Sequence, residues 1–377
     1  MYWQTEKLRK GATWASGGTY RLDLPANGLL SAIMLHAYGT PVVDSMLTAE
    51  KWRLWDYISK IEVIANGSTV LKSLTGRVAK FYSWFNGGIA SPDKPFNYGT
   101  STHRFHNCLN FGRYLFDPMF GLDLSRYNSV ELQLTNDASG TYYTGDWSVD
   151  VDLVYMRDVP GAPFQGFFRT EEWRKWTTVQ AAWQYLELPT EYNIRDVVLQ
   201  VEPERTTKAN ADTTPYNVAY VVQCLLKTGL LKVFDGNLRD LWYLNAWDHG
   251  RDIIQGIEPY HSDTYGVVTG VGQSLGAAGL RLEHSGDQST YGTTLLPGED
   301  SDTLQREANS DSDQDSLLVL GLALEDCAYL RFNTPDEPAS YLNPAEQQTV
   351  QLNIQTRDAS SAANGTIRVM LDRLVKY

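Results

Sequence analysis

The chain has 377 residues, of which 42% are hydrophobic and only 20% are charged, and its formal net charge is −13. That length exceeds one ordinary core and suits two domains of about 150–200 residues. The acidic balance and the lack of a basic groove argue against direct nucleic-acid binding, because phosphate contacts would be repelled. The sequence contains no run of eighteen apolar residues, so no transmembrane helix is predicted. The polar start MYWQTEKLRK does not resemble a secretory signal.

The first half of the chain reads as short strands with one helix. Residues 1–10 are expected to form a short arm. Apolar residues between Val70 and Phe85 recur at helical spacing, and Ser68 or Thr69 could cap that helix. Alternation and turn residues predict strands at 14–25, 29–37, 58–65, 103–115 (a pair), 128–136 and 147–157.

The second half follows a linker and repeats this pattern. The linker is DVPGAPFQG (158–166), with two Pro and two Gly, so we expect one domain at 1–160 and another at 161–377. A short helix is expected after Asp235-Gly236, with Leu238, Leu241 and Leu244 on a shared face. Strands are predicted at 177–188, 193–203, 217–226, 229–235, 317–324, 327–332, within 350–360 and at 366–377.

Residues 249–316 have no counterpart in the first half. They are rich in Gly, Ser and Asp, and residues 285–316 hold eight acidic residues against one basic residue, Arg306. This composition is typical of loops that project into solvent, so we predict an acidic loop insertion in the second domain.

The two halves match one another in sequence, which indicates a duplicated domain. Residues 184–201 repeat 19–37, and residues 350–360 repeat 130–139. Residues 229–245 are interpreted as the counterpart of 58–76, with Asp235-Gly236 answering Asn66-Gly67. The matched pairs include Glu6 with Glu171, Arg9 with Arg174, Lys10 with Lys175, Leu22 with Leu186, Leu24 with Leu188, Pro25 with Pro189, Leu30 with Ile194, Ile33 with Val197 and Leu35 with Leu199.

The strand pattern predicts an all-β fold of two tandem, eight-stranded antiparallel jelly rolls. Short strands with turn signals and a long return connection are typical of this kind of sandwich. A parallel α/β sheet would require a helix between most strands, and those helices are missing. We expect short helices in both halves and loop insertions in the second.

One motif resembles a catalytic serine. Gly272-Gln273-Ser274-Leu275-Gly276 fits G-x-S-x-G, but an α/β-hydrolase needs its triad histidine well beyond the serine. The last histidine, His284, follows after only ten residues, so Ser274 is interpreted as a loop residue without a catalytic role.

Two groups could resemble metal ligands. His103 and His106 lie three apart in a predicted strand, where they would point to opposite faces, and we interpret them as ordinary polar positions. Asp311, Asp313 and Asp315 alternate as in a calcium loop but lack its Gly and closing Glu, which favours a solvated acidic loop over weak calcium binding. The sequence therefore predicts no catalytic, cofactor or metal residues, and no enzyme.

Cysteines and sequons also have simple interpretations. Cys108, Cys224 and Cys327 are far apart and odd in number, which favours buried free thiols in a reducing compartment. The sequons at Asn66 and Asn364 are interpreted as tight turns.

The chain has eleven Trp and 22 Tyr, which could be sugar-stacking platforms or could fill cores and interfaces. We favour the second interpretation, with Trp52, Trp55, Trp84 and Trp242 in mixed apolar runs. Large aromatic residues outside the strand pattern are candidates for a subunit interface: Trp52, Trp55 and Trp247.

These features together resemble one protein family. A tandem duplication of jelly rolls, acidic insertions and the runs LPANGLLSAIMLHA, IEVIANGSTVLKSLTG and FGRYLFDPMFGLDLSRYNSVELQLTN are similar to double jelly-roll viral major capsid proteins. That lineage includes adenovirus hexon and the tailless, membrane-containing phages.

The resemblance implies a homotrimer in which six jelly rolls form a pseudo-hexagonal capsomer that tiles an icosahedral shell. It implies a location in the virion, with assembly in the host cytoplasm, and contacts with neighbouring capsomers, with penton and with other minor capsid proteins. It also implies contact between the N-terminal arm, residues 1–10, and an inner membrane. No cofactor is implied.

The alternative is a two-domain jelly-roll protein that binds glycans, or a glycan amidase or hydrolase. That activity would need paired carboxylates facing a cleft between the domains, and a secretory signal would be expected.

Overall fold

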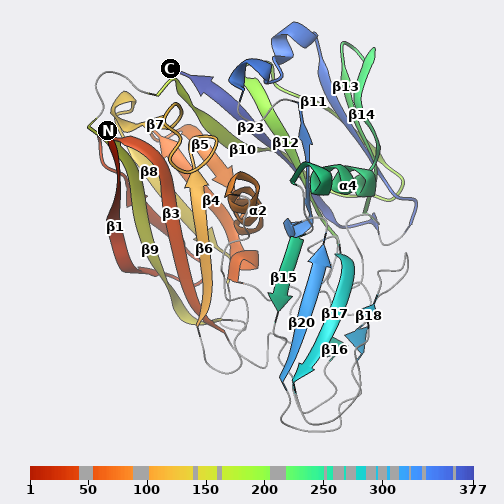
Figure 1. Cartoon of the computed structure of the whole chain (residues 1–377), viewed down its shortest axis with the longest axis horizontal. Helices are drawn as coiled ribbons and strands as arrows, with labels where there is room; N and C mark the ends of the chain where they lie inside the picture. The colour runs from red at the N-terminus through yellow and green to blue at the C-terminus, as the bar shows by residue number, and fades with distance from the viewer. Residues whose placement is uncertain are drawn as a thin grey trace.

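The computed structural model is all-β, with two α-helices among its described residues (Figure 1). Between residues 250 and 321 it describes only the backbone of six strands. The other described residues are 1–41, 54–87, 102–138, 143–158, 164–203, 218–249, 324–332, 337–359 and 362–377.

The first half is a sandwich of two four-stranded antiparallel sheets. One sheet has the order β1-β9-β3-β6 and the other β2-β8-β4-β5. The strands are β1 (Tyr2–Trp14), β2 (Thr19–Asp23), β3 (Leu29–Pro41), β4 (Ile58–Ala65), β5 (Thr69–Leu74), β6 (His103–Asn110), β8 (Val130–Asn136) and β9 (Tyr143–Arg157). The two-residue strand β7 (Leu122–Asp123) also pairs with β3.

The second half repeats this arrangement with the orders β10-β23-β12-β21 and β11-β22-β13-β14. Each half therefore supplies eight principal strands, as the jelly-roll prediction requires. The strands are β10 (Gly166–Thr177), β11 (Trp183–Glu187), β12 (Asn193–Glu202), β13 (Ala219–Leu226), β14 (Leu231–Asn237), β21 (Cys327–Arg331), β22 (Val350–Thr356) and β23 (Thr366–Lys376).

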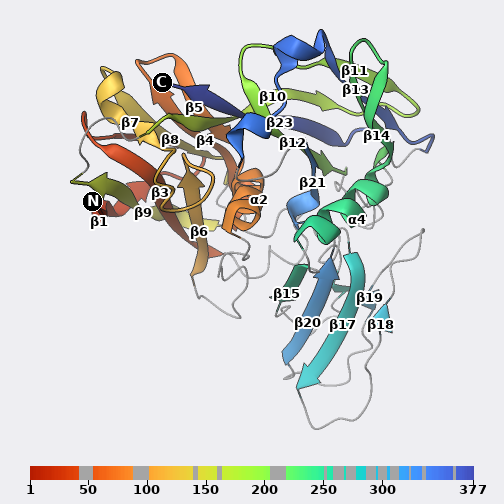
Figure 2. The same cartoon turned by 45° about the horizontal axis from the view of Figure 1, so that its top comes forward.

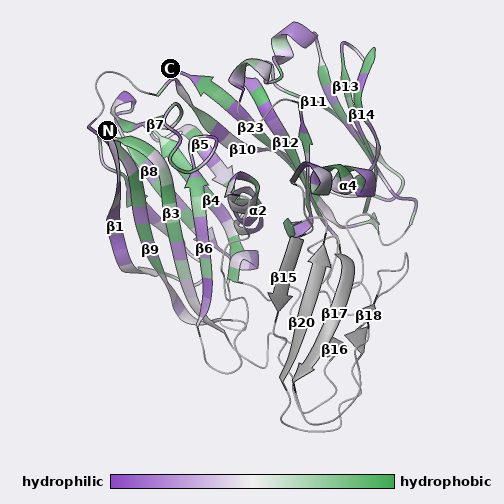
Figure 3. Cartoon of the chain, in the orientation of Figure 1, coloured by the Kyte–Doolittle hydropathy of each residue, from purple (hydrophilic) through white to green (hydrophobic). Residues whose placement is uncertain are grey.

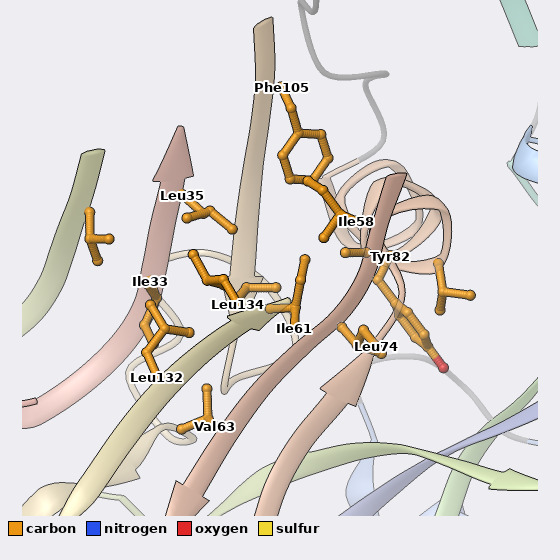
Figure 4. Close-up of a cluster of buried hydrophobic side chains, with 14 of the residues drawn as sticks. Ile33, Leu35, Ile58, Ile61, Val63, Leu74, Tyr82, Phe105, Leu132 and Leu134 are labelled. Atoms are coloured by element: carbon orange, nitrogen blue, oxygen red, sulfur yellow. The ribbon is translucent and has the colours of Figure 1, made fainter. Parts of the chain in front are cut away.

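Alternating apolar residues fill the space between the two sheets of each half. In the first sandwich these side chains come from β3, β4 and β8 and lie against one another (Figure 4). In the second, Val197, Leu199 and Val201 of β12 belong to a separate core. Hydrophobic and hydrophilic residues alternate along the strands in Figure 3, as a sheet with one covered face requires. Each large apolar side chain that is fully buried contributes about 1.5–3 kcal/mol.

A single continuous sheet connects the two sandwiches. Strand β5 of the first half pairs in parallel with β10 of the second, with Lys72 opposite Thr170 and Ser73 opposite Glu171. The result is one eight-stranded sheet, β2-β8-β4-β5-β10-β23-β12-β21. The sequence predicted two domains joined through the linker at 158–166, whereas backbone hydrogen bonding between β5 and β10 also joins them. The domain boundary at residue 160 stays a prediction.

The duplication extends to an irregularity in the first strand of each half. The register of β1 shifts between Lys7 and Arg9, and that of β10 shifts between Glu172 and Arg174. The residue passed over is Leu8 in one strand and Trp173 in the other, and each packs against the core of its own sandwich. A bulge at the same place in both halves supports the match of Glu6 with Glu171.

The predicted N-terminal arm is wrong, because β1 begins at Tyr2 and pairs with β9 along most of its length. Most β1 side chains are exposed on both faces. An edge strand of this kind has no apolar alternation, which is why the sequence did not reveal it. Residues 166–176 form most of β10 and were not predicted as a strand either; β10 is not an edge strand, but its mixed run of charged and aromatic residues, GFFRTEEWRKWT, also lacks apolar alternation.

The predicted start of the first helix is also wrong. Residues 69–74 form strand β5, and helix α2 spans Gly76–Gly87. Its cap is Thr75, whose Oγ1 accepts a hydrogen bond from the backbone N–H of Val78 at 3.3 Å. Asn66-Gly67 is the β4–β5 hairpin turn, with both residues at positive φ. Three residues, 66–68, connect the antiparallel strands β4 and β5, and residues at positive φ are typical of such tight hairpin turns.

The match of Asp235-Gly236 with the hairpin turn Asn66-Gly67 is also wrong. Asp235 and Gly236 lie within β14, directly before helix α4 (Leu238–His249), so β14 corresponds to β5 and β13 to β4. The equivalent turn is at residues 227–230.

Three further predictions differ from the structure in detail. The strand pair at 103–115 is the single strand β6, which ends at Asn110. The strand at 177–188 begins only at Trp183. The insertion at 249–316, expected as loops, contains antiparallel strands of the sheet β15-β20-β17-β18 and of the pair β16-β19. The insertion strands are β15 (Ile253–Ile257), β16 (Val267–Val268), β17 (Ala277–Ser285), β18 (Thr294–Leu295), β19 (Leu304–Gln305) and β20 (Gln314–Gly321).

Arg77 of α2 forms buried ion pairs that connect the halves. Its guanidinium donates to Glu325 and Glu202 at 3.1 Å, and also to Asp326. Asp56 lies 3.7 Å away. Burial lowers the pKa of Arg77, but these carboxylates outweigh it and raise that pKa well above its ordinary value. One guanidinium therefore compensates acidic groups from both halves.

Lys72 is a second buried charge at the junction. Its Nζ donates to Thr170 Oγ1 at 2.6 Å, and that hydroxyl donates to Asp372 Oδ1 at 2.8 Å. Burial lowers the pKa of Lys72 to about 8, although the Asp372 carboxylate opposes this shift. The lysine thus joins β5 to β10 and β23 through one hydrogen-bonded chain.

Replacing Arg77 should destabilise the protein strongly. Arg77→Ala leaves Glu325 and Asp326 buried without their cation, and breaking such a pair costs about 3–5 kcal/mol. We expect the midpoint of thermal unfolding to fall by several degrees. The matched control is Arg21→Ala at the exposed pair with Glu131, which should change stability by less than about 1 kcal/mol. Equal effects of the two variants would contradict the role assigned to Arg77.

Lys72 should make stability depend on pH at the alkaline end. Between the folded pKa of about 8 and the unfolded pKa of about 10.4, the unfolded chain binds more protons, so stability rises with pH in that window. Relative to Lys72→Met, the wild type should gain on the order of 1–3 kcal/mol between pH 8 and 10.5. Urea midpoints measured across this range test the expectation, with the exposed Lys60→Met variant as control. If the difference in the free energy of unfolding between wild type and Lys72→Met stays constant across this pH range, the expected titration of Lys72 is contradicted.

Candidate assembly surface

Several residues considered as catalytic or metal-binding lie outside the part of the chain that the structure describes. Ser274, Asp311 and Asp313 are in undescribed segments, and the side chains of His284 in β17 and Asp315 in β20 are not described. Their interpretation as loop or solvated residues stays a prediction.

The two histidines of β6 point to opposite faces, as predicted. His103 is buried, its Nδ1 lies 3.0 Å from the Tyr143 hydroxyl, and burial lowers its pKa to about 4. His106 lies on the outer face with its Nδ1 2.6 Å from His36 Nδ1, and burial and the neighbouring His36 lower its pKa. Among the described residues no group of three or more His, Cys, Asp or Glu side chains could hold a metal ion.

The large aromatic residues divide into core and surface. Trp55, Trp84 and Trp242 are buried, which confirms their assignment to the core, while Trp52 is outside the described residues. Trp55 was also a candidate for a subunit interface, and this is wrong. Its indole N–H donates to Glu325 Oε1 at 3.0 Å within the chain. Trp247 is 84% exposed and remains a candidate.

Cysteines and turns largely follow the sequence interpretation. Cys224 and Cys327 are buried free thiols, whereas Cys108 on the outer face of β6 is partly exposed. Asn66 and Asn364 both have positive φ, as expected for turns.

The carboxylates between the two halves do not form an open catalytic pair. Asp196 and Asp372 are fully buried, and both pair with Arg195. Asp196 also lies 3.3 Å from Arg331. Burial raises the pKa of Asp196 to about 6 against the effect of these arginines. Asp196 and Asp372 are therefore buried ion-pair partners, whereas glycan hydrolysis would require paired carboxylates that face a cleft.

Helix α2 shows how one half covers the other. It lies between the two sandwiches in both views of the chain (Figures 1 and 2). Phe81, Tyr82 and Phe85 are buried, and the Phe85 and Tyr329 rings lie 4.7 Å apart at their centroids. The Arg331 guanidinium lies 4.8 Å from the Phe85 centroid. An aromatic helix face thus packs on the outer face of the sheet containing β12, β21 and β23.

Helix α4 occupies the equivalent place in the second half, but its outer face is uncovered. Leu238, Leu241 and Trp242 are buried against their own sandwich. The opposite face carries three large exposed side chains, named here the α4 surface: Tyr243, Leu244 and Trp247. The expectation that Leu244 shares the buried face is wrong, because the helix buries positions 238, 241, 242 and 245.

More apolar side chains lie exposed on the adjoining hairpin of β13 and β14. Large exposed apolar patches on soluble proteins indicate interaction sites. Among the described strands, β14 ends one sheet of the second sandwich and β1 ends one sheet of the first, so each has a strand neighbour on one side only. The exposed residues of this hairpin are Tyr220, Leu230, Leu231 and Val233.

The sequence identified only part of this surface. Trp247 was singled out because it is a large aromatic residue outside the strand pattern, whereas Tyr243 and the exposed hairpin residues were not. No helix in the described part of the chain has the length and apolar character needed to cross a bilayer.

Comparison with known proteins gives matches at the level of structure. No protein-family model matches the chain, and neither does any curated protein sequence. The crystal structure of the major capsid protein of Sulfolobus turreted icosahedral virus matches with a TM-score of 0.61 and 10% identity, over 100% of this chain and 97% of that one.

Two further solved structures agree. A chain in the atomic structure of the same virus gives a TM-score of 0.62 at 11% identity, over 100% of this chain and 91% of that one. The major capsid protein P2 of bacteriophage PM2 gives 0.52 at 11% identity, with coverage of 100% and 98%. Over its whole length, the chain therefore has the double jelly-roll fold of these viral major capsid proteins.

Proposed function

We propose that this chain is a major capsid protein that forms homotrimeric, pseudo-hexagonal capsomers, which tile the icosahedral shell of a virion. The observation that carries this proposal is the side-by-side arrangement of two equivalent sandwiches, which spans the whole chain and matches capsid proteins throughout.

The symmetry of the proposed trimer explains why one chain carries two similar sandwiches. A chain with two similar sandwiches contributes two similar blocks to an oligomer, so three chains contribute six. The chain also has an edge strand at each side, β1 in the first sandwich and β14 in the second. A closed ring covers both kinds of edge, and covering edges protects a β protein from uncontrolled aggregation.

The proposed location is the capsid shell, with assembly in the host cytoplasm. The partners are other copies of the chain, neighbouring capsomers, and penton and other minor capsid proteins. Residues 2–14 are not a free arm, because they pair with β9, so we assign them no membrane contact. The protein acts as a structural component without a cofactor, not as an enzyme.

The first test of this function is the mass of the purified protein in solution. Light scattering and native mass spectrometry should give a particle of about three times the 42.4 kDa chain mass. An obligate contact of this kind should bury more than about 2,000 Å² and persist on dilution. Electron micrographs of the protein should show particles with hexagonal outlines. A protein that stays monomeric at high concentration would rule out the capsomer.

A second test addresses the enzymatic alternative. Ser274→Ala should leave the oligomeric mass unchanged, and neither wild type nor variant should hydrolyse esters or cleave glycans. Hydrolysis by the wild type that disappears in the variant would favour the enzyme. Binding of the monomer to glycans would favour the lectin.

A further inference from the structure

We propose that the α4 surface of one copy packs on the outer face of β3 and β6 in the first sandwich of a neighbouring copy. This contact would repeat between chains the contact that α2 makes within a chain. The inference rests on the oligomer of the proposed function and identifies the surfaces that form it.

The two helices correspond residue by residue. Each has twelve residues, and each begins directly after a polar capping residue. Thr75 caps α2, and the Asn237 side chain accepts a hydrogen bond from the backbone N–H of Asp240 at 2.9 Å. Counting from these caps pairs Phe81 with Tyr243, Tyr82 with Leu244 and Phe85 with Trp247.

These paired residues differ in what covers them. Phe81, Tyr82 and Phe85 are buried because the second sandwich lies over them, with Tyr329 and Arg331 against Phe85. The residues of the α4 surface are at least half exposed, and Trp247 reaches 84%. Large apolar side chains at the same three places indicate that α4 also binds a sheet face, and that this face belongs to another molecule.

The chain itself shows which face would receive α4. Val198 faces α2 and lies opposite Tyr329 and Met370 in the sheet of the second sandwich. The repeat pairs Val198 with Met34, since Ile33 and Leu35 match Val197 and Leu199. Met34 lies opposite Cys108 in β6 and Asp152 in β9. Met34 and Cys108 are partly exposed, so this face can accept a partner.

The strand edges next to these surfaces support the same pairing. Within the chain, α2 follows β5, and β5 pairs in parallel with β10. In the repeat, α4 follows β14, and the counterpart of β10 is β1. Both β14 and β1 end their sheets among the described strands. Parallel addition of β14 to β1 of the next copy would therefore bring α4 over β3 and β6.

The charges on the two surfaces are compatible with this contact. Arg77 of α2 pairs with acidic residues of the second sandwich. Arg239 of α4 holds the same place in the repeat. Asp150 and Asp152 of β9 lie beside the receiving face, where both carboxylates pair with Lys7 of the same chain.

Photocrosslinking tests the contact directly. The full chain is made with p-benzoylphenylalanine in place of Trp247, irradiated, and analysed by mass spectrometry of the crosslinked peptides. We expect intermolecular crosslinks to the peptides of β3 and β6, with Met34 a main site. The same probe at Val179, which is 64% exposed and lies between β10 and β11 of the second sandwich, should give few crosslinks to those strands.

A pair of charge variants tests the energetic role of the surface. Trp247→Glu should raise the protein concentration for half-dissociation of the oligomer at least about 30-fold, the effect of losing an aromatic anchor worth about 2 kcal/mol. Val179→Glu should leave it unchanged. Because both positions are exposed in the single chain, both variants should keep the wild-type circular dichroism spectrum.

The outcomes separate this inference from the proposed function. A wild-type protein that is monomeric at all concentrations would contradict both the proposed capsomer and the α4 contact. A wild-type trimer whose crosslinks from position 247 go to α4 or to the second sandwich keeps the trimer and overturns the inference. An oligomer that Trp247→Glu does not weaken also overturns it.

Discussion

The parallel pairing of β5 with β10 is the constraint on which the rest of the structure depends. It joins one sheet of each sandwich into a single eight-stranded sheet. The first strand of the second half, β10, therefore lies directly beside the first half. That position brings α2 against the sheet of the second sandwich and buries Arg77, Lys72 and their acidic partners at the junction. Charges are tolerated there because each is paired, and an unpaired charge in the same place would cost several kcal/mol.

Much of the fold could be predicted from the sequence, because most strands bury one face and show it as alternation. Strand β4 has the predicted bounds, and those of β8 and β12 agree within two residues, whereas β3 begins as predicted but runs four residues further, to Pro41. The edge strand β1 was missed because its side chains are polar on both faces. Strand β5 was read as helix because Val70, Leu71 and Leu74 fit helical spacing within a six-residue strand.

The candidate surface was harder to predict for a different reason. Phe81 and Tyr243 are both aromatic residues at the same position of equivalent helices, yet one is buried and the other exposed. Their difference arises from what lies beside each helix, and within the described part of one chain only α2 has a sandwich next to its outer face. Local pattern identifies a large apolar side chain, but tertiary context decides whether its own chain covers it. Only Trp247, a large aromatic residue outside the strand pattern, gave a signal in the sequence.

The two helices also differ in polarity, and the way each contact forms explains this. The α2 contact forms within one folding chain, so Arg77 and Lys80 can be buried as their partners become fixed around them. The proposed α4 contact forms between folded molecules, which must first remove water from both surfaces. Desolvating charges is expensive, whereas removing water from apolar surface is favourable. Trp242 and Trp247 of α4 occupy the positions of Lys80 and Phe85 in α2. The helix proposed to bind a second molecule is therefore richer in tryptophan, whose burial can drive the association of two folded chains.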